Sequence, residues 1–294
     1  MQYNCIYDGP GIRTCVFFKG CPLRCAWCHN PESQRLDPQM SYFAEKCVLC
    51  GSCMKTCPNH AIQITKKRME RNVGKCALCG ECARVCPNGA MEKIGREVNV
   101  GEVVEIVMRD EPFYKNSGGG VTISGGEPTL QSVFLLELLS ELKNKGIHTA
   151  IETSGYFEPD LINELCKNTD LFLFDIKHAD PAAHKAYTGV TNEKIMFNLK
   201  SIFELVGQNR IIPRIPMIPG FNTNTDTIEN IIKIIIAAGY FGSVHIMHYN
   251  NTARSKWEKI GRGLEYCDYG KLSDEETGAL KSQFEKAGFE VVIN

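Results

Sequence analysis

Gly20-Cys-Pro-Leu-Arg-Cys-Ala-Trp-Cys-His29 is the most informative stretch of this 294-residue chain. The three cysteines of this stretch, here called the cysteine loop, are Cys21, Cys25 and Cys28, with the spacing C-x3-C-x2-C. Four-iron clusters are normally held by four thiolates. Three cysteines therefore leave one iron without a protein ligand, and such an open position is typical of catalytic metal sites. The spacing predicts an iron–sulfur cluster that takes part in chemistry.

Eight further cysteines form two copies of the pattern C-x2-C-x2-C-x3-C-P, placed 29 residues apart. Bacterial two-cluster ferredoxins have this pattern, and the fourth cysteine of each copy binds the cluster of the other copy. We therefore predict two cysteine sets. The Cys47 set is Cys47, Cys50, Cys53 and Cys86, and the Cys76 set is Cys57, Cys76, Cys79 and Cys82. With the cysteine loop this makes three [4Fe-4S] clusters. The two clusters of the repeat could relay electrons, or they could only stabilise a segment with little core of its own.

Fifteen cysteines also raise the alternatives of a secreted disulfide protein and a zinc protein. The chain opens without a charged and then apolar signal segment, and it is long enough to bury a core without disulfides. Structural zinc usually takes two separated pairs of ligands, which differs from the spacing here. We therefore expect a cytoplasmic iron–sulfur protein that works in a reducing, anaerobic environment.

Composition and charge exclude two classes of partner. Hydrophobic residues make up 43% of the chain and charged residues 23%, as in an average globular protein. The longest apolar run, 231–240, is too short to span a bilayer. A net charge of −1 offers no basic surface for nucleic acid. We expect a monomer that binds neither membranes nor nucleic acid.

Outside residues 40–95, strand patterns alternate with helical patterns. The strand patterns lie at 14–19, 121–124, 148–153, 171–176, 210–215 and 244–249. Apolar strands joined by helices form parallel sheets that are buried on both faces. Six such units predict an α/β fold, a partial (β/α)6 TIM-like barrel formed by residues 1–39 and 96–294. Residues 40–95, here called the insert, are predicted to be a ferredoxin-like domain with two [4Fe-4S] clusters.

Polar or glycine-rich residues stand where most of these strands end. Besides the cysteine loop they are Gly125, Gly126, Glu127, Glu152, Thr153, Asp175, Lys177, Arg214, His248, Tyr249 and Asn250. The active site of a TIM-like barrel lies at the C-terminal ends of its strands. We therefore expect these residues to share one rim, although one or two could be ordinary turns or ion pairs.

Several motifs occur together and in order. They are Asp8-Gly-Pro-Gly-Ile-Arg13, an aromatic residue (Trp27) before the third cysteine of the loop, Ser124-Gly-Gly-Glu-Pro128, Glu152-Thr-Ser-Gly155, Asp175-Ile-Lys-His178 and Ile215-Pro-Met-Ile-Pro-Gly220. With these motifs the chain resembles the glycyl-radical-enzyme activating enzymes, which are radical S-adenosylmethionine enzymes related to the pyruvate formate-lyase activator. The resemblance covers nearly the whole chain. The insert resembles that of the subgroup that activates dehydratases, decarboxylases and carbon–nitrogen lyases.

The resemblance implies a specific reaction. The open iron would bind the amino and carboxylate groups of S-adenosylmethionine, and one electron would cleave the sulfonium to give a 5′-deoxyadenosyl radical. That radical would take a hydrogen atom from a backbone glycine of a partner glycyl radical enzyme. A flavodoxin or a ferredoxin would supply the electron.

The resemblance also implies roles around the methionine part of the cofactor. Gly125 and Gly126 would let the backbone approach it closely, and Glu127 would accept a hydrogen bond from its ammonium group. Lys177 would offer a cation to its carboxylate, and Arg214 would pair with a charged end of the substrate.

Further roles follow by position in the family. Glu152 and Asp175 match acidic ligands of a monovalent cation, although aspartate is usual at the first position. Asp8 matches the position that faces the glycine loop of the partner. Asn250 aligns with a family histidine, and either it or His248 would make that contact.

Two further residues would complete the cofactor site that the resemblance implies. Four cysteines have no place in the predicted clusters. Trp27 and Thr153 would contact the cofactor. The remaining cysteines are Cys5, Cys15, Cys166 and Cys267, which have no ligand spacing and are interpreted as buried or incidental thiols.

Two rival functions stay open at this point. One is a radical S-adenosylmethionine enzyme that acts on a small molecule or a ribosomal peptide. Peptide-maturing relatives tend to carry auxiliary cysteines after the barrel, whereas only Cys267 follows Cys166 here. The other is a non-catalytic electron-transfer subunit, which leaves the cysteine loop and the Gly-Gly-Glu sequence unexplained.

Overall fold

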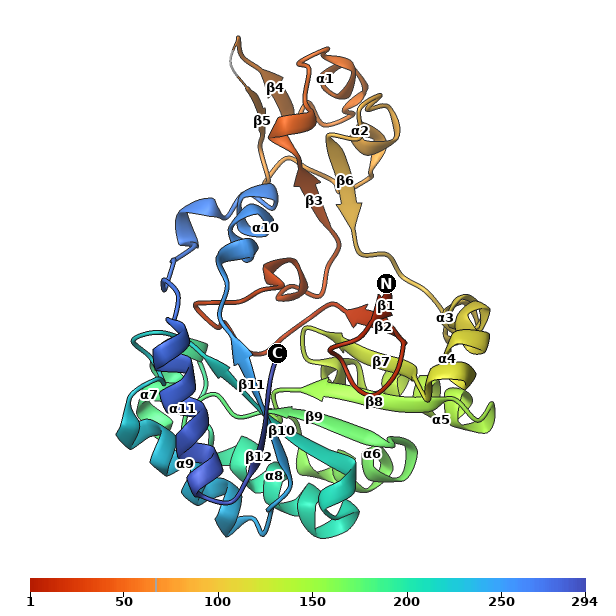
Figure 1. The fold of residues 1–294 in the computed structure, drawn as a ribbon. Coiled ribbons are helices and arrows are strands. Elements are labelled where there is room, and N and C mark those ends of the chain that lie inside the picture. The colour runs from red at the N-terminus through yellow and green to blue at the C-terminus, as the bar shows by residue number, and fades with distance from the viewer. Residues whose placement is uncertain (67) are drawn as a thin grey trace.

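The main body of the protein is one mixed sheet with helices around it, as the computed structural model shows for residues 1–66 and 68–294 (Figure 1). The strand order is β1-β2-β7-β8-β9-β10-β11-β12. Its strands are β1 (Gln2–Cys5), β2 (Arg13–Phe18), β7 (Gly120–Gly125), β8 (His148–Thr153), β9 (Leu171–Asp175), β10 (Ile211–Met217), β11 (Ser243–His248) and β12 (Glu290–Ile293). All neighbours are parallel except β1 and β2. The predicted α/β fold with a parallel sheet is confirmed, and an open sheet of this order is consistent with a partial barrel.

Helices connect the parallel strands. They are α3 (Val100–Val107), α4 (Glu111–Ser117), α5 (Ser132–Asn144), α6 (Ile162–Asn168), α7 (Pro181–Thr188), α8 (Glu193–Val206), α9 (Thr225–Ala237), α10 (Arg254–Lys259) and α11 (Asp274–Lys286). The apolar residues of α5 recur at helical spacing and are fully buried, namely Leu135, Leu138, Leu139 and Leu142. They join one core cluster with residues of the sheet and the other helices. None of the helices described here is long and apolar enough to cross a bilayer.

A buried arginine ties the N-terminal residues to the sheet. The guanidinium of Arg13, fully buried, donates to the Thr122 hydroxyl at 2.6 Å and to the carbonyls of Val121 and Pro10 at 2.8 and 3.1 Å. The same Thr122 hydroxyl donates to the carbonyl of Asp8 at 2.6 Å. Because a buried charge is stable only when its donors are satisfied, Arg13 fixes the turn that carries Asp8.

The insert forms a separate lobe above the barrel (Figure 1). Its base is an antiparallel ribbon of β3 (Gln39–Tyr42) and β6 (Met91–Ile94). Between them lie α1 (Ser52–Thr56), the hairpin of β4 (Ile62–Ile64) and β5 (Met69–Arg71), and α2 (Glu81–Arg84). Its fully buried apolar core is small, namely Met40, Ile62, Met69, Cys82 and Met91, with cysteines packed around it. A core of this size predicts that bound metal supplies much of the folding free energy of the lobe.

Candidate active site

The cysteine loop follows β2 and is held by backbone hydrogen bonds. Gly20 N–H donates to the carbonyl of Ser33 at 2.7 Å, while Arg24 and Ala26 N–H donate to the carbonyls of Thr188 and Tyr187 at 2.7 and 2.9 Å. The loop is thus pinned both to its own continuation and to the end of α7. These bonds fix the backbone of the loop without using its thiols.

The three thiols of the cysteine loop lie in a poorly solvated place. Burial raises the pKa of Cys21 to about 12, and it also raises the pKa values of Cys25 and Cys28. Three such thiols ionise at neutral pH only with strong compensation, which a bound metal provides. The donor set therefore fits a cluster with three protein ligands.

One lysine lies beside these thiols. Lys177 is 7% exposed, and its Nζ donates to Asp175 Oδ2 at 2.7 Å. Burial alone would lower its pKa, but the Asp175 carboxylate and the nearby thiols of Cys25 and Cys21 outweigh this and raise the pKa. Lys177 therefore remains a cation next to the cysteine loop.

The ends of β8, β9 and β10 form a charged cluster, here called the rim network: Glu152, Asp175, Lys177 and Arg214. Arg214 forms an ion pair with Glu152 through Nη1, and its Nε lies 3.7 Å from Asp175 Oδ1. Burial raises the pKa of Glu152, although the Arg214 guanidinium opposes this. Two carboxylates and two cations leave the network without net charge. The structure thus brings these four sequence-predicted residues together at one rim.

Glu127 has a different environment. Its carboxylate is 1% exposed, with Oε2 accepting from Ser154 N–H at 2.8 Å and Ser154 Oγ at 2.6 Å. Oε1 accepts from Thr153 Oγ1 at 2.9 Å and from Thr129 Oγ1 and N–H at 2.8 and 3.4 Å. Five donors of the protein therefore already use this carboxylate, and Thr153 is one of them. A hydrogen bond from Glu127 or Thr153 to the cofactor stays a prediction.

The two glycines before Glu127 are required for a reason that the sequence did not give. A Cβ on Gly126 would lie 2.0 Å from the carbonyl oxygen of Gly20, and one on Gly125, where φ is +111°, would lie 2.3 Å from that of Phe18. The missing side chains therefore let the cysteine loop pack against this turn, which Glu127 N–H joins by donating to the Gly20 carbonyl at 2.9 Å.

Trp27 packs in an aromatic cluster rather than standing free. It is 6% exposed, and its ring centroid lies 4.7 Å from that of Phe221 and 6.4 Å from that of Tyr187. These contacts bury the far side of the cysteine loop against the segments that follow β9 and β10. Contact of Trp27 with the cofactor stays a prediction.

His248 and Asn250, the two candidates at the end of β11, differ in position. His248 is half-buried in β11, where it pairs with Met217 of β10. Asn250 is exposed, and its side chain caps the short 3-10 helix 251–253 by accepting from Thr252 N–H at 3.2 Å. The structure therefore uses the Asn250 amide as a cap and does not join it to the rim network.

Sequence reasoning missed His29, the residue after the third cysteine. Its Nε2 is buried without a hydrogen-bond partner among residues 1–66 and 68–294, and its ring lies 5.7 Å from that of Tyr249. Burial and the nearby Lys256 cation lower its pKa, so the ring is neutral at pH 7. A buried nitrogen without a partner is costly, which makes His29 a candidate for contact with a ligand. The signal in the sequence is the position of His29 directly after Cys28, a predicted metal ligand.

Asp8 is positioned partly by a cysteine that the sequence analysis interpreted as incidental. The thiol of Cys15 donates to Asp8 Oδ2 at 3.2 Å, and ligand-type atoms of Cys5, Asp8 and Cys15 lie within 4.8 Å of one another. Burial raises the pKa of both thiols, which keeps them neutral and unreactive. Cys15 is therefore a donor that holds the Asp8 carboxylate.

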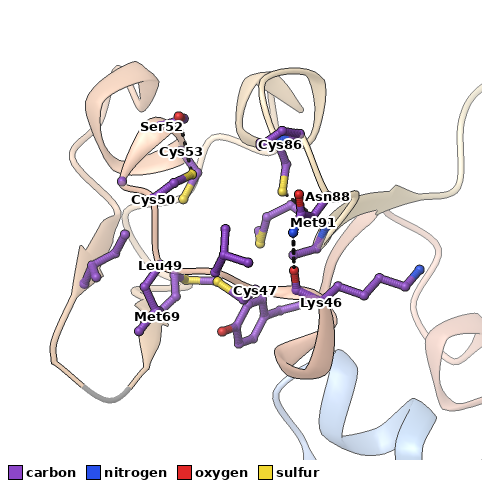
Figure 2. Close-up of a pocket in the computed structure, with 16 residues that line it drawn as sticks. Lys46, Cys47, Leu49, Cys50, Ser52, Cys53, Met69, Cys86, Asn88 and Met91 are labelled. Atoms are coloured by element: carbon purple, nitrogen blue, oxygen red, sulfur yellow. Dashed lines mark hydrogen bonds between the residues drawn. The ribbon is translucent and has the colours of Figure 1, made fainter.

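The insert contains two cavities, and their cysteine linings correspond to the two predicted sets. Cys47, Cys50, Cys53 and Cys86 line one cavity (Figure 2). The Cys76 set lines a second cavity. Figure 2 shows the sulfurs of the first set pointing toward a common space, from the segment 47–53 that leads into α1 and from the loop of Cys86.

The two halves of the repeat share an unusual backbone. Leu49 and Leu78 have φ of +56° and +54°, and Gly51 and Gly80 have φ of +84° and +86°. Leucine rarely adopts positive φ, so the surrounding structure must stabilise it. Successive N–H groups in such a conformation form concave sites for anions and iron–sulfur clusters. Both cavities therefore fit a four-iron cluster.

Comparison with known proteins defines the class first. Residues 73–247 match the Radical SAM superfamily, and residues 46–90 match the 4Fe-4S dicluster domain. A domain of a pyruvate-formate lyase-activating enzyme from Bacteroides vulgatus ATCC 8482 superposes with a TM-score of 0.51 at 24% identity, over 60% of this chain and 99% of that domain, which supports the fold. The protein is a radical S-adenosylmethionine enzyme with additional iron–sulfur clusters.

Relatives with known activities then define the family. The chain is 41% identical to the trans-4-hydroxy-L-proline dehydratase activating enzyme of Clostridioides difficile, over 100% of this chain and 97% of the relative. It is 37% identical to the choline trimethylamine-lyase activating enzyme of Oleidesulfovibrio alaskensis, over 99% and 95%. The chain therefore belongs to the glycyl-radical-enzyme activating enzymes.

Proposed function

We propose that the cysteine loop and the rim network together are the site at which this activating enzyme cleaves S-adenosylmethionine and generates the glycyl radical of its partner. The observation that carries the proposal is that the three half-buried, poorly solvated cysteines lie beside Lys177 and the ends of β8, β9 and β10. When bound, the cluster and S-adenosylmethionine supply the electron transfer and the radical that takes a hydrogen atom from glycine. The protein supplies orientation, charge and exclusion of water.

Each residue of the site has a task that its environment permits. Cys21, Cys25 and Cys28 would hold three irons. Lys177, a buried cation, would orient a carboxylate, and the neighbouring Arg214 would remain paired with Glu152 while facing the charged end of the substrate. Hydrogen-atom transfer needs no proton donor, so the raised pKa of Lys177 suits a group that must stay protonated throughout.

The monovalent cation that the resemblance implies at Glu152 and Asp175 would meet two carboxylates that already form ion pairs. Both carboxylates already pair with Arg214 or Lys177, and the four side chains carry no net charge. A cation would have to compete with two buried side-chain cations. We therefore expect the enzyme to keep its activity when sodium and potassium are replaced by a large organic cation.

Asp8 would face the glycine loop of the partner. Its turn is fixed by Arg13 and Thr122, and its carboxylate by Cys15. A glycine backbone can enter a narrow site because it has no side chain, and this allows close approach to the reacting carbon. The charge of Asp8 raises the pKa values of both Glu152 and Arg214, which supports a position for Asp8 close to the rim network.

The insert would hold two [4Fe-4S] clusters in a ferredoxin-like domain, on the Cys47 set and the Cys76 set, and would pass electrons to the cysteine loop. Residues 40–95 carry nine Lys or Arg against four Glu, whereas the whole chain has a net charge of −1. Cys50 and Cys79 are the exposed members of the two sets. A basic lobe with exposed ligands suits an acidic one-electron carrier such as a flavodoxin or a ferredoxin. We further propose that the protein acts as a monomer in the reducing cytoplasm, which size-exclusion chromatography and fractionation test.

The activation assay tests the proposed function. The protein is reconstituted anaerobically and incubated with S-adenosylmethionine, a reductant and a candidate partner glycyl radical enzyme. A stable glycyl radical on the partner supports the proposal. Cys25→Ala should abolish the radical, because it removes a ligand of the open-iron cluster. Asp8→Asn should impair radical formation on the partner more than cofactor cleavage without the partner. Cofactor cleavage with no radical on any partner would contradict it.

A further inference from the structure

One short helix touches both the insert and the cysteine loop. Helix α10 follows β11 and lies between the barrel and the insert (Figure 1). No sequence motif marks this helix, and the reaction described above gives it no task. Its contacts on the two sides involve a lysine and a tryptophan two positions apart.

On the insert side, Lys259 contacts the segment that leads into Cys47. Its Nζ lies 4.4 Å from the centroid of the Phe43 ring and 3.9 Å from Glu45 Oε1. Lys46 lies at the same 4.4 Å from that ring, so two cations hold one aromatic side chain. Lys46 also lines the cavity of the Cys47 set (Figure 2).

On the barrel side, Trp257 contacts the cysteine loop. Its side chain is 3% exposed, and its Nε1–H donates to the carbonyl oxygen of Cys28 at 2.9 Å. Arg262 lies 4.6 Å from the Trp257 ring and donates to Gln34 Oε1 at 2.7 Å, and the Gln34 backbone carbonyl accepts from Cys21 N–H at 3.2 Å. The indole and the guanidinium therefore hold the loop near two of its three cysteines.

The second cavity has no comparable connection. Among residues 1–66 and 68–294, no hydrogen bond, ion pair or ring contact joins the lining of the Cys76 cavity to α10. Its polar contacts stay inside the insert, such as Asn59 to Lys75 and Arg71 to Met40. The two cavities are therefore not equivalent with respect to the cysteine loop.

We propose that α10 couples the insert to the cysteine loop, and that the Cys47 set holds the cluster from which the catalytic cluster receives its electron. Lys259 positions the segment before Cys47, and Trp257 positions the backbone of Cys28. With both clusters bound, one electron would pass from the reduced cluster of the Cys47 set to the catalytic cluster, with no proton moved and no bond broken. An external low-potential carrier would reduce the donor cluster again. This inference rests on the electron relay of the proposed function.

Magnetic interaction between clusters tests which of the two cysteine sets lies nearer to the catalytic cluster. Cys50→Ala and Cys79→Ala are a matched pair, because the two residues are equivalent in the repeat and both are exposed. In the fully reduced, S-adenosylmethionine-bound protein, Cys50→Ala should remove the dipolar broadening and fast spin relaxation of the catalytic-cluster signal, and Cys79→Ala should retain them. The opposite pattern, or equal effects of both variants, overturns the assignment.

Reduction kinetics test the role of α10. Trp257→Phe keeps an aromatic ring but loses the N–H, and Lys259→Met keeps an alkyl chain but loses the charge. With pre-reduced flavodoxin, each variant should slow reduction of the catalytic cluster about threefold to tenfold. One lost hydrogen bond or cation–π contact lowers the population of the coupled arrangement by about this factor. Reduction by dithionite should be unchanged, and Lys281→Met on α11 is the control.

The possible results separate the two levels of the proposal. Flavodoxin-driven rates equal to wild type in both α10 variants overturn the role of α10. Loss of four irons from Trp257→Phe also overturns it, because the indole would then retain the cluster rather than couple it. If Cys50→Ala leaves flavodoxin-driven reduction unchanged, the relay itself is wrong, while activation by dithionite still tests the proposed function.

Discussion

The Glu127→Gln substitution separates two roles for the Gly-Gly-Glu sequence. In the structure the carboxylate is fully buried and accepts five hydrogen bonds, from Thr129, Thr153 and Ser154. Its task is then to hold the turn that packs against the cysteine loop. If instead its main task is to bind the ammonium group of the cofactor, the folded protein without cofactor should be insensitive to the change.

The cost of the substitution follows from which donors can adjust. A glutamine amide has one acceptor and one donor end, and its oxygen would stay toward the three donors at Oε1. Its NH2 group then faces Ser154 N–H, which cannot turn away, whereas the Ser154 hydroxyl can rotate. One buried N–H without a partner costs about 1–3 kcal/mol, and losing the charge on the remaining bonds adds about 1 kcal/mol. Burial raises the pKa of Glu127, which means that its buried charge destabilises the fold. Removing the charge therefore offsets part of the cost, and we expect a net loss of about 2–3 kcal/mol in the free energy of unfolding.

Thermal unfolding of the reconstituted protein measures this loss. For a protein of 294 residues about 2–3 kcal/mol corresponds to a decrease of roughly 3–5 °C in Tm. Glu137→Gln, the same chemical change at an exposed position of α5, is the control and should change Tm by less than about 2 °C. A Glu127→Gln protein with wild-type Tm and weakened S-adenosylmethionine binding would refute the structural role.

Three further predictions follow from the geometry. Gly126→Ala should lower the iron content from about 12 to about 8 atoms per chain, because its Cβ would lie 2.0 Å from a backbone oxygen of the cysteine loop; 12 irons in a folded variant would contradict this. Cys57→Ser should deplete the cluster of the Cys76 copy, not that of its own copy, as resonance spectra of the reduced protein would show. Burial and the Arg13 charge lower the pKa of His148 below 6.5. The unfolded chain then binds more protons, so Tm should fall as the pH drops from 7.5 to 6.0, and His148→Gln should reduce that slope.

The sequence predicted what depends on spacing along the chain. The cysteine patterns specify their sets because ligand spacing is a local property, and the leucines of α5 appear at helical period because one face is buried. The rim network could also be predicted from the sequence, since parallel strands place their C-terminal ends together. Strand β1 could not be predicted, because its residues are mostly exposed and show no alternation of apolar and polar residues.

Contacts between distant segments could not be predicted. Trp257 and Cys28 are separated by more than 200 positions, and nothing local in either segment indicates their hydrogen bond. The carboxylate of Glu127 looked free because three of its five donors belong to Thr153 and Ser154, which lie in another segment of the chain. Asn250 aligned with a family histidine, yet its amide caps the next turn, since asparagine competes for nearby backbone N–H groups.

Isotope transfer from the partner tests the central claim most directly. The partner glycyl radical enzyme is prepared with deuterium at the Cα of its glycines and activated with the protein, S-adenosylmethionine and a reductant. Direct abstraction predicts that the glycyl radical forms and that deuterium appears in 5′-deoxyadenosine, in an amount that matches the radical. If the radical forms while the 5′-deoxyadenosine carries no deuterium, the hydrogen atom does not pass directly from the glycine to the cofactor, and the account is wrong.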